Sequence, residues 1–570
     1  MRSAFYGFNV ASRGLFAAKT NLDILNHNIS NANTDGYSRQ YAVQKAGRPL
    51  PSAGIGMVGS GAEVTSIARY HDDYLDTKYW SVNMDLGEAT IKNQQMSQIE
   101  ALFGEPTDYG FNTILNDYFD SLSELSKSPT EESTRTSVVN KADGICTYFK
   151  DMSELFRRYQ REANFAIKSK VDEINYIAKQ LQIINKQINN TELTGFPAND
   201  LRDERGRLLD QLSKIVNIEA TETADVNGKK TMNVSINGQT LVSGSGANFL
   251  ECVPRDNVQN PEDEPFMYDV YWTSGQKFYL NNANLKGELK GYVDIRDGNN
   301  NENFTGSVTA GAGTNVLTID NPSRTDLPAG GEILIDGASY EYSSFTYNSA
   351  TNQMTFNLTA ASPATATDVR MGNGIEFKGI PYYMQRLNEF VRTFAKEVNK
   401  IHEQGNSGTG LSFFTYEGYT GVPALDTTDP TSYNQLTVDN MTVNKQIKSD
   451  IGLIMTKFNQ TDGESANDLL LKMSDLRHKQ DMFSQGEPEN YLQAVLGVVG
   501  IDKKYASSLE TSQKNLSNLI DNQRISISGA NINEETVNLV KYQQIYNASA
   551  KIISVFDEIY DVTINRMGAS

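Results

Sequence analysis

The sequence predicts an α+β multidomain protein with long terminal helices forming a coiled-coil-like core, a helical rod domain, and inserted outer β-rich domains. Three observations lead to this fold class. Both ends of the chain carry apolar residues three and four positions apart, the spacing of one helix face. Strand-like segments and turn residues are concentrated in the middle of the chain. The length of 570 residues is enough for several hydrophobic cores.

The first segment predicts a long helix whose apolar residues repeat every seven positions, as in the seam of a coiled coil. The residues of this predicted assembly seam are Phe8, Ala11, Leu15, Ala18, Leu22, Leu25 and Ile29. The stripe covers only three to four heptads, so an ordinary amphipathic helix of a bundle explains the spacing equally well.

The last segment has the same spacing. Its predicted seam consists of Tyr542, Ile545, Ala548, Ile552, Val555, Ile559 and Val562. We expect Asn533 to be the N-cap of this helix, with Glu534 and Glu535 at the positive end of the helix dipole. Arg566 followed by Gly568 predicts the end of the helix.

Each terminal stripe needs a partner, because isolated helices owe most of their stability to packing. No short connection joins the two terminal helices, so the partner lies across the chain or in another copy. The sequence leaves both possibilities open. If the partner is another copy, each seam is exposed before docking, and we then expect roughly residues 1–45 and 525–570 to be poorly ordered in the free subunit and to fold on docking.

Between the ends, the pattern changes from helical to strand-like and back. Helical spacing extends from about Leu75 to Leu212 and resumes at Gln385–Glu403. Asn237-Gly238 between two short apolar runs predicts a β-hairpin. We therefore predict four domains: a terminal-helix axial core of residues 1–45 plus 525–570, a helical rod domain of 46–216 plus 380–524, a β-rich outer domain of 217–297, and an inserted small β domain of 298–379.

The composition excludes several classes of protein. A net charge of −19 argues against nucleic acid or an anionic membrane as a partner, since both favour an excess of Lys and Arg. No apolar run reaches the ~20 residues of a membrane-spanning helix. The first 20 residues lack the pattern of a cleavable signal peptide. Cys146 and Cys252 are too few for a disulfide scaffold or a cysteine-rich zinc site, and we expect them to be buried thiols.

Three matches to catalytic or ligand-binding motifs fail on their surroundings. Gly54 to Gly59 fits GxGxxG, but no buried strand precedes it. The polar run that starts at Asp297 has Val308 at the position where a calcium loop needs a ligand. His402-Glu403 is not followed by a second histidine at helical spacing. We therefore expect no catalytic residue, no cofactor and no metal.

Residues 29–40 follow the first predicted helix directly and read Ile-Ser-Asn-Ala-Asn-Thr-Asp-Gly-Tyr-Ser-Arg-Gln. The first half predicts a helix end and a turn, because Asn31 and Asn33 cap helices and Gly36 permits positive φ. Tyr37 and Arg39 add an aromatic face and a fork of hydrogen-bond donors. A capped helix followed by a turn is the simplest interpretation.

This run resembles the signature of bacterial flagellar axial proteins, the rod, hook and hook-associated proteins. The residues that carry the resemblance are Asn31, Asn33, Gly36, Tyr37, Arg39 and Gln40, and the Gly-Tyr-Ser-Arg-Gln continuation is similar to that of the hook–filament junction proteins. Many members have Pro where this chain has Asp35, and either residue supports a turn.

The resemblance covers most of the chain. Further matching segments are 102–106, 118–119, 128–135, 199–209, 399–405, 526–535 and 542–544. One tract departs from the pattern: residues 298–379 look like an inserted small β domain, with strands expected at 315–320, 331–336 and 353–358.

The resemblance implies a non-enzymatic structural subunit that assembles on the hook tip and joins hook to filament. Its implied partners are further copies of itself in a ring, the hook protein, the second junction protein and an export chaperone, with no nucleic acid and no membrane insertion. The implied location is the extracellular flagellum, reached by type III export with the N-terminus uncut. Two alternatives stay open: another axial subunit, such as the hook protein or second junction protein, or a junction protein whose inserted domain is an adhesin or an enzyme.

Overall fold

The computed structural model describes residues 6–52, 56–103, 110–193, 195–224, 230–282, 284–300, 304–322, 324–325, 327–336, 338–371, 375–421, 425–427 and 432–563. The chain forms two compact units. The first unit contains residues 1–86, 173–249 and 512–570, and the second contains residues 87–172 and 250–511. No helix among the described residues is both long enough and apolar enough to cross a membrane.

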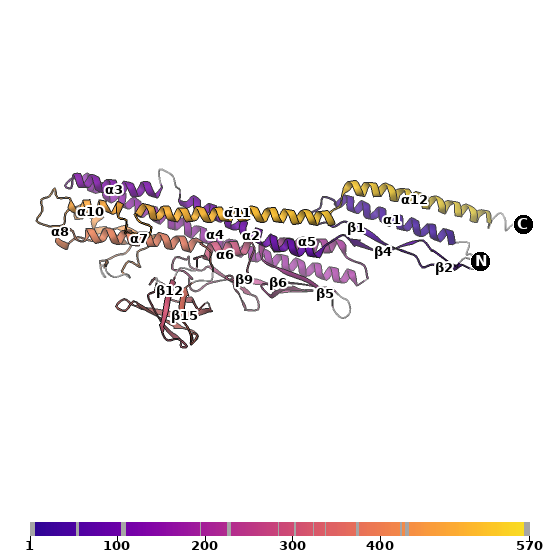
Figure 1. Ribbon diagram of the computed structural model, residues 1–570, viewed down its shortest axis with the longest axis horizontal. Helices are drawn as coiled ribbons and strands as arrows, with labels where there is room; N and C mark the ends of the chain where they lie inside the picture. Colours follow the sequence, from indigo (N-terminus) through magenta and orange to yellow (C-terminus); the bar gives the residue numbers. More distant parts are fainter. Residues whose placement is uncertain are drawn as a thin grey trace. The chain divides into compact units, whose positions relative to one another are not determined.

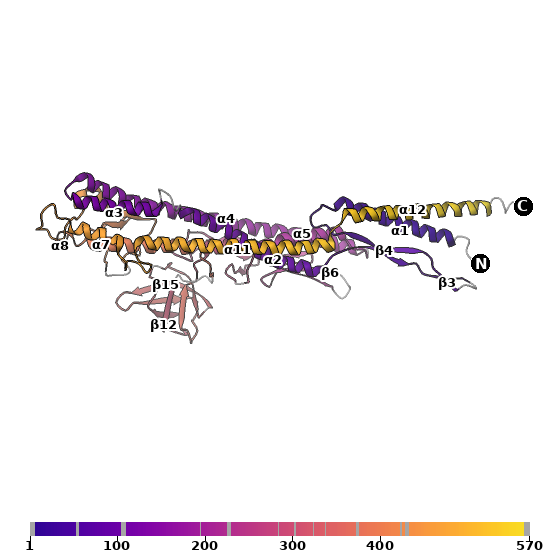
Figure 2. The ribbon, with the colours of Figure 1, turned by 45° about the horizontal axis from the view of Figure 1, so that its top comes forward.

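Two terminal helices, α1 (Tyr6–Asn31) and α12 (Ile532–Asp561), lie side by side in the first unit (Figures 1 and 2). The helix predicted from the first heptad stripe is therefore confirmed as α1. Asn531 is the N-cap of α12, since its side chain accepts a hydrogen bond from the Asn533 amide at 3.0 Å. The prediction of Asn533 as N-cap is wrong, because either asparagine is chemically able to cap and the helix begins two residues earlier. Arg566 and Gly568 lie outside the described residues.

A long hairpin follows α1, in which β1 (Gln40–Ala46) pairs antiparallel with β4 (Ala62–Arg69). A shorter pair, β2 (Leu50–Ser52) and β3 (Gly56–Val58), occupies its tip. Part of the GxGxxG match therefore lies in a strand of this hairpin, and its Gly54 and Ile55 lie outside the described residues.

The first unit also contains α5 (Asn199–Ile215) and residues from three longer helices that contribute to both units: α2 (Asp73–Phe103), α4 (Glu132–Glu192) and α11 (Pro488–Ser528). A four-stranded sheet follows α5, formed by β5 (Glu219–Ala224), β6 (Lys230–Ile236), β7 (Gln239–Ser243) and β8 (Gly246–Ala247). The predicted hairpin is confirmed, because Asn237 and Gly238 both have positive φ, at 49° and 76°, between β6 and β7.

The second unit has an aromatic core between its helices. Its further helical segments are α3 (Phe111–Lys127), α6 (Glu288–Asp297), α7 (Ile380–His402), α8 (Gly405–Gly408), α9 (Lys445–Ser449), η1 (Ile451–Leu453), α10 (Asp468–Asp475) and η2 (Leu476–His478). The ring of Phe390 in α7 lies 5.1 Å from that of Phe111 and 5.4 Å from that of Phe149, between centroids. These packed rings bury large apolar areas and hold the helices together.

Small sheets border this core: β9 (Leu250–Pro254), β10 (Tyr268–Trp272) and β11 (Lys277–Phe278) form one, and β18 (Phe414–Tyr416) with β19 (Met441–Val443) forms another. The sheet β5–β8 belongs to the first unit and the sheet β9–β11 to the second, although both come from the segment 217–297 that was predicted as one domain. The division into four domains stays a prediction.

The insertion between α6 and α7 contains a closed barrel (Figure 1). Its strands, in barrel order, are β12 (Phe304–Ala310), β13 (Val316–Asp320), β16 (Gln353–Leu358), β15 (Ala338–Asn348), β14 (Gly331–Ile335) and β17 (Asp368–Met371). The three predicted strands correspond to β13, β14 and β16. The chain enters and leaves through adjacent backbone, since the Gly379 amide donates to the Gly298 carbonyl at 2.9 Å.

Candidate functional site

The contact between α1 and α12 is an antiparallel pairing in heptad register. Gly7 lies against the ring of Phe556, Gly14 lies against Ser549, and Asn28 bonds to Glu535. Successive members are seven and fourteen residues apart on both helices, in opposite directions. This repeat keeps one face of each helix toward the other along its length.

Five large apolar residues of the predicted α1 seam lie in this helix. Leu25 is buried, and Phe8, Leu15, Leu22 and Ile29 are partly buried. On α12, Glu535 is buried, and the partly buried residues are Asn538, Leu539, Tyr542, Tyr546, Ser549, Ala550, Ile553, Phe556 and Tyr560. Ser549 and Phe556 contact α1 directly, and the Tyr560 ring lies 6.5 Å from that of Phe8. The partner of α1 within the chain is therefore this face of α12, which we call the aromatic stripe: Tyr542, Tyr546, Ser549, Ala550, Ile553, Phe556 and Tyr560. It includes Tyr542 of the predicted α12 seam and is otherwise displaced from that seam by about one residue.

Four residues of the predicted α12 seam form a second stripe, which we call the outer stripe: Ile545, Ile552, Val555 and Ile559. These four side chains are 40%, 48%, 49% and 49% exposed. At about 100° of rotation per residue, the outer stripe is centred roughly 110° around the helix from the aromatic stripe. Helix α12 is thus apolar on two faces, of which α1 covers only one.

A polar network closes the end of the helix pair. Asn28 Nδ2 donates to Glu535 Oε2 at 3.0 Å and to the Gln40 carbonyl at 2.9 Å. Asn28 Oδ1 accepts from the Tyr37 hydroxyl at 2.7 Å and from the Gln40 amide at 2.9 Å. All four hydrogen-bonding positions of this buried amide are used, as a buried polar side chain requires. Sequence reasoning missed Asn28, because one asparagine inside a helical stripe gives no sign of a partner 507 residues away.

Arg39 connects the same network to α12. Its Nε lies 2.5 Å from Glu535 Oε1, and its Nη1 lies 3.3 Å from Glu534 Oε2. Its guanidinium lies over the Tyr70 ring, 5.6 Å from the centroid. The Arg39 amide also donates to the Ser528 carbonyl at 2.7 Å, which ties the start of the hairpin to the end of α11.

The other motif residues shape the turn. Gly36 has φ 76°, the left-handed conformation that glycine adopts without strain. Asn31 Nδ2 donates to the His27 carbonyl at 3.0 Å, whereas Asn33 is exposed. Burial, and then the nearby charges of Asp200, Asp203 and Glu535, raise the pKa of the Tyr37 hydroxyl. Tyr37 therefore stays protonated and keeps its hydrogen bond to Asn28.

A cavity of about 530 Å³ adjoins this network and is lined by the turn 32–38, the start of α2, α5 and the segment 521–530.

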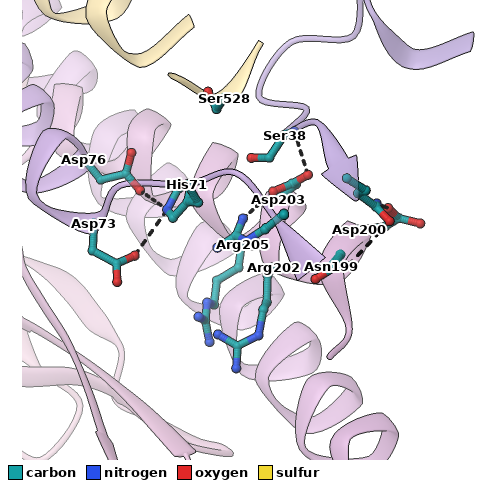
Figure 3. A network of polar contacts seen from close by, with 12 residues as sticks. Ser38, His71, Asp73, Asp76, Asn199, Asp200, Arg202, Asp203, Arg205 and Ser528 are labelled. Carbon is teal, nitrogen blue, oxygen red and sulfur yellow. Dashed lines mark hydrogen bonds and ion pairs between the residues drawn. The ribbon is translucent and has the colours of Figure 1, made fainter. Parts of the chain in front are cut away.

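Among the described residues, His71, Asp73 and Asp76 form a group of metal-type ligands beside this cavity (Figure 3). His71 Nε2 is 2.8 Å from Asp76 Oδ2 and 3.3 Å from Asp73 Oδ1. Because Arg524 Nε lies 2.9 Å from Asp76 Oδ1, that carboxylate is already paired with a cation.

Comparisons with known proteins match most of the chain. The model of the flagellar hook-associated protein FlgK helical domain matches residues 96–311, and that of the flagellar basal body rod FlgEFG protein C-terminal matches residues 521–567. Flagellar hook-associated protein 1 of Bacillus subtilis is 26% identical, covering 100% of this chain and 99% of the relative. The Escherichia coli protein of that name is 28% identical, covering 98% and 99%. The solved FlgK hook junction protein of Burkholderia pseudomallei aligns with 79% of this chain and 100% of its own, at 12% identity and a TM-score of 0.48.

Proposed function

We propose that this chain is a structural subunit that assembles on the hook tip and joins hook to filament, because it is 26% and 28% identical to two flagellar hook-associated proteins 1 over nearly its whole length. This is the function that the resemblance of residues 31–40 predicts. The assignment favours the first junction protein over the hook protein and the second junction protein, because the matched relatives all carry the name hook-associated protein 1.

The observation that carries the assembly mechanism is the outer stripe of α12. Its four residues stay 40–49% exposed in the described chain, although the other apolar face of the same helix packs on α1. A subunit stacked around an axis needs a contact between two different surfaces that repeats from copy to copy. An apolar stripe on a long helix provides one half of such a contact.

The proposed partners are further copies of this chain in a ring, the hook protein and the second junction protein. The outer stripe also supports an export chaperone as a fourth partner, since exposed apolar stripes promote aggregation before assembly. We place the assembled subunit in the extracellular part of the flagellum, after type III export.

Deletion of the gene, followed by electron microscopy of the cells, tests the proposal. We expect hooks without filaments and filament protein released into the medium, with both defects reversed by a plasmid copy. Normal filaments on the deletion strain would refute the proposed function.

A further inference from the structure

Helix α5 begins with alternating charges, Asn199-Asp200-Leu201-Arg202-Asp203-Glu204-Arg205, for which the proposed function gives no role. Figure 3 shows the arginines pointing away from the aspartates. Arg202 Nε donates to Glu192 Oε1 at 2.7 Å, and Arg205 Nη2 donates to Glu222 Oε1 at 3.0 Å. The basic side of α5 is thus attached to the end of α4 and to β5.

The acidic side of α5 contacts the segments that lead to the terminal helices. Asp203 Oδ2 accepts the Ser38 amide at 2.9 Å, and its Oδ1 is paired with Arg69 at the end of β4. Asp200 Oδ1 accepts Gln40 Nε2 at 2.6 Å and lies 3.3 Å from His27 Nε2 in α1. The Asn199 side chain donates to the Ile67 carbonyl at 3.0 Å.

Three segments that lead to the terminal helix pair line one cavity together with Asp203 of α5. One segment is the turn after α1, which carries Ser38, and the second is the end of β4, which carries Arg69. The third is the α11–α12 junction, where Ser528 accepts the Arg39 amide, one residue from Ser38. Asp203 contacts the first two segments with one carboxylate whose side chain is only 8% exposed, and Arg69 opposite it is 14% exposed.

We propose that α5 is the coupling element that fixes the terminal helix pair to the rod, and that Asp203 is its main positioning residue. A buried carboxylate that holds a backbone amide and an arginine at once leaves little freedom between the two segments. Losing it leaves both groups buried without a partner, which is costly. The inference rests on the proposed function, because fixing the α12 outer stripe relative to the rod matters only if that stripe is a contact between subunits.

The test measures access to the turn in assembled flagella. A reporter chain carries Ser38→Cys and Cys252→Ser, since Ser38 is 4% exposed, Cys146 is buried and Cys252 is partly buried. Maleimide labels position 38 in purified hook–filament particles, with Asp203 intact, with Asp203→Ala and with Asp203→Asn. The matched control is Glu204→Gln, one residue away, because Glu204 is paired with Arg207 of the same helix, and no other ion pair of Glu204 is found among the described residues.

We expect Asp203→Ala to be labelled at least about tenfold faster and to release more filament protein into the medium. Asp203→Asn keeps an acceptor for the Ser38 amide and should recover part of the slow labelling. Labelling of Asp203→Ala at the rate of Glu204→Gln, with filaments attached, would overturn the inference. If the alanine variant is not exported, Asp203→Asn decides: a rate equal to that of Glu204→Gln overturns the inference and a faster rate supports it. Failure of the proposed function looks different, since then even the deletion strain keeps its filaments.

Discussion

Asn28 Nδ2 in α1 donates a hydrogen bond to Glu535 Oε2 in α12 at 3.0 Å, and this bond joins residues 507 positions apart in the chain. Glu535 is fully buried and also faces Arg39, so a single carboxylate connects α1, the motif after α1 and α12. The predictions below start from this joint and extend along the terminal helices.

Replacing Glu535 with Ala should loosen the terminal helix pair by on the order of 3 kcal/mol, because Arg39 and Asn28 would lose a buried partner. The measurement is the temperature at which filaments detach from cells that carry the variant, which should fall. Glu534→Gln is the control, since Glu534 is exposed and contributes one contact of 3.3 Å to Arg39. Equal detachment temperatures for the two variants would contradict the role given to Glu535.

Ile552→Asp should abolish assembly without unfolding the subunit. Ile552 lies in the outer stripe and is 48% exposed, so a charge there costs little in the free chain but must be buried at a subunit contact. The measurement pairs filament counts per cell with thermal melting of the purified chain. Lys551→Asp, at the exposed neighbouring position, is the control and should keep its filaments. A full set of filaments on cells with Ile552→Asp would show that this face is not used.

Gly7→Leu should disrupt the pairing of α1 with α12, because the Phe556 ring occupies the space that a side chain at position 7 needs. Overpacking of this kind costs about 1–3 kcal/mol. Adding Phe556→Ala should restore part of the loss by making room. The measurement is the fraction of cells with filaments for the single and the double variant. A harmless Gly7→Leu would mean that the two helices do not pair in this register.

The free subunit should protect the amides of α1 and α12 from exchange less than those of α4, because the pair leaves the outer stripe of α12 uncovered. Assembly should raise the protection of both terminal helices. Hydrogen exchange on the free chain and on purified flagella measures the difference. Full protection of both ends in the free chain would contradict the expectation that they become ordered on docking.

His402 makes the second unit sensitive to acid. Burial lowers the pKa of His402 to about 4, and the neutral ring is held by donation from Nδ1 to the Leu411 carbonyl and by acceptance from the Met455 amide at 3.0 Å. The unfolded chain takes up this proton near pH 6.5, whereas the folded chain does not. The free energy of unfolding is therefore unaffected by the titration of His402 above about pH 6.5. It falls as the pH drops from 6.5 toward 4, by about 3 kcal/mol at most.

Burial and the charge of Asp297 raise the pKa of Asp263 to about 6, and this shift acts in the opposite direction over the same pH range. The measurement is therefore the difference in unfolding free energy between the wild type and His402→Asn, which should shrink as the pH falls from 7 to 4.5. A constant difference would contradict the account, as would an imidazole that titrates near pH 6.5 in NMR spectra.

Local patterns predicted the elements that depend on neighbouring residues. The heptad stripe predicted α1, Asn237-Gly238 predicted the β6–β7 turn, and the three strands predicted in the insertion are β13, β14 and β16. Each is set by side-chain spacing or by the backbone freedom of one or two residues.

The pairings between distant segments were not predictable in the same way. Helix α12 carries two apolar stripes of the same period, and the spacing does not say which one faces α1. The bond between Asn28 and Glu535, the contacts of Asp203 and the closure of the barrel depend on residues far apart in sequence. No single local pattern carries that information, because tertiary contacts select among elements that are locally equivalent.

Photo-crosslinking at position 552 tests the central claim most directly, because it reads out which chain covers the outer stripe in an assembled flagellum. A photoreactive phenylalanine derivative replaces Ile552, and the same derivative at Tyr546, on the face toward α1, is the control. We predict covalent products that contain two polypeptide chains from position 552 and products within one chain from position 546. Products within one chain from both positions would contradict the claim that the outer stripe is the contact between subunits.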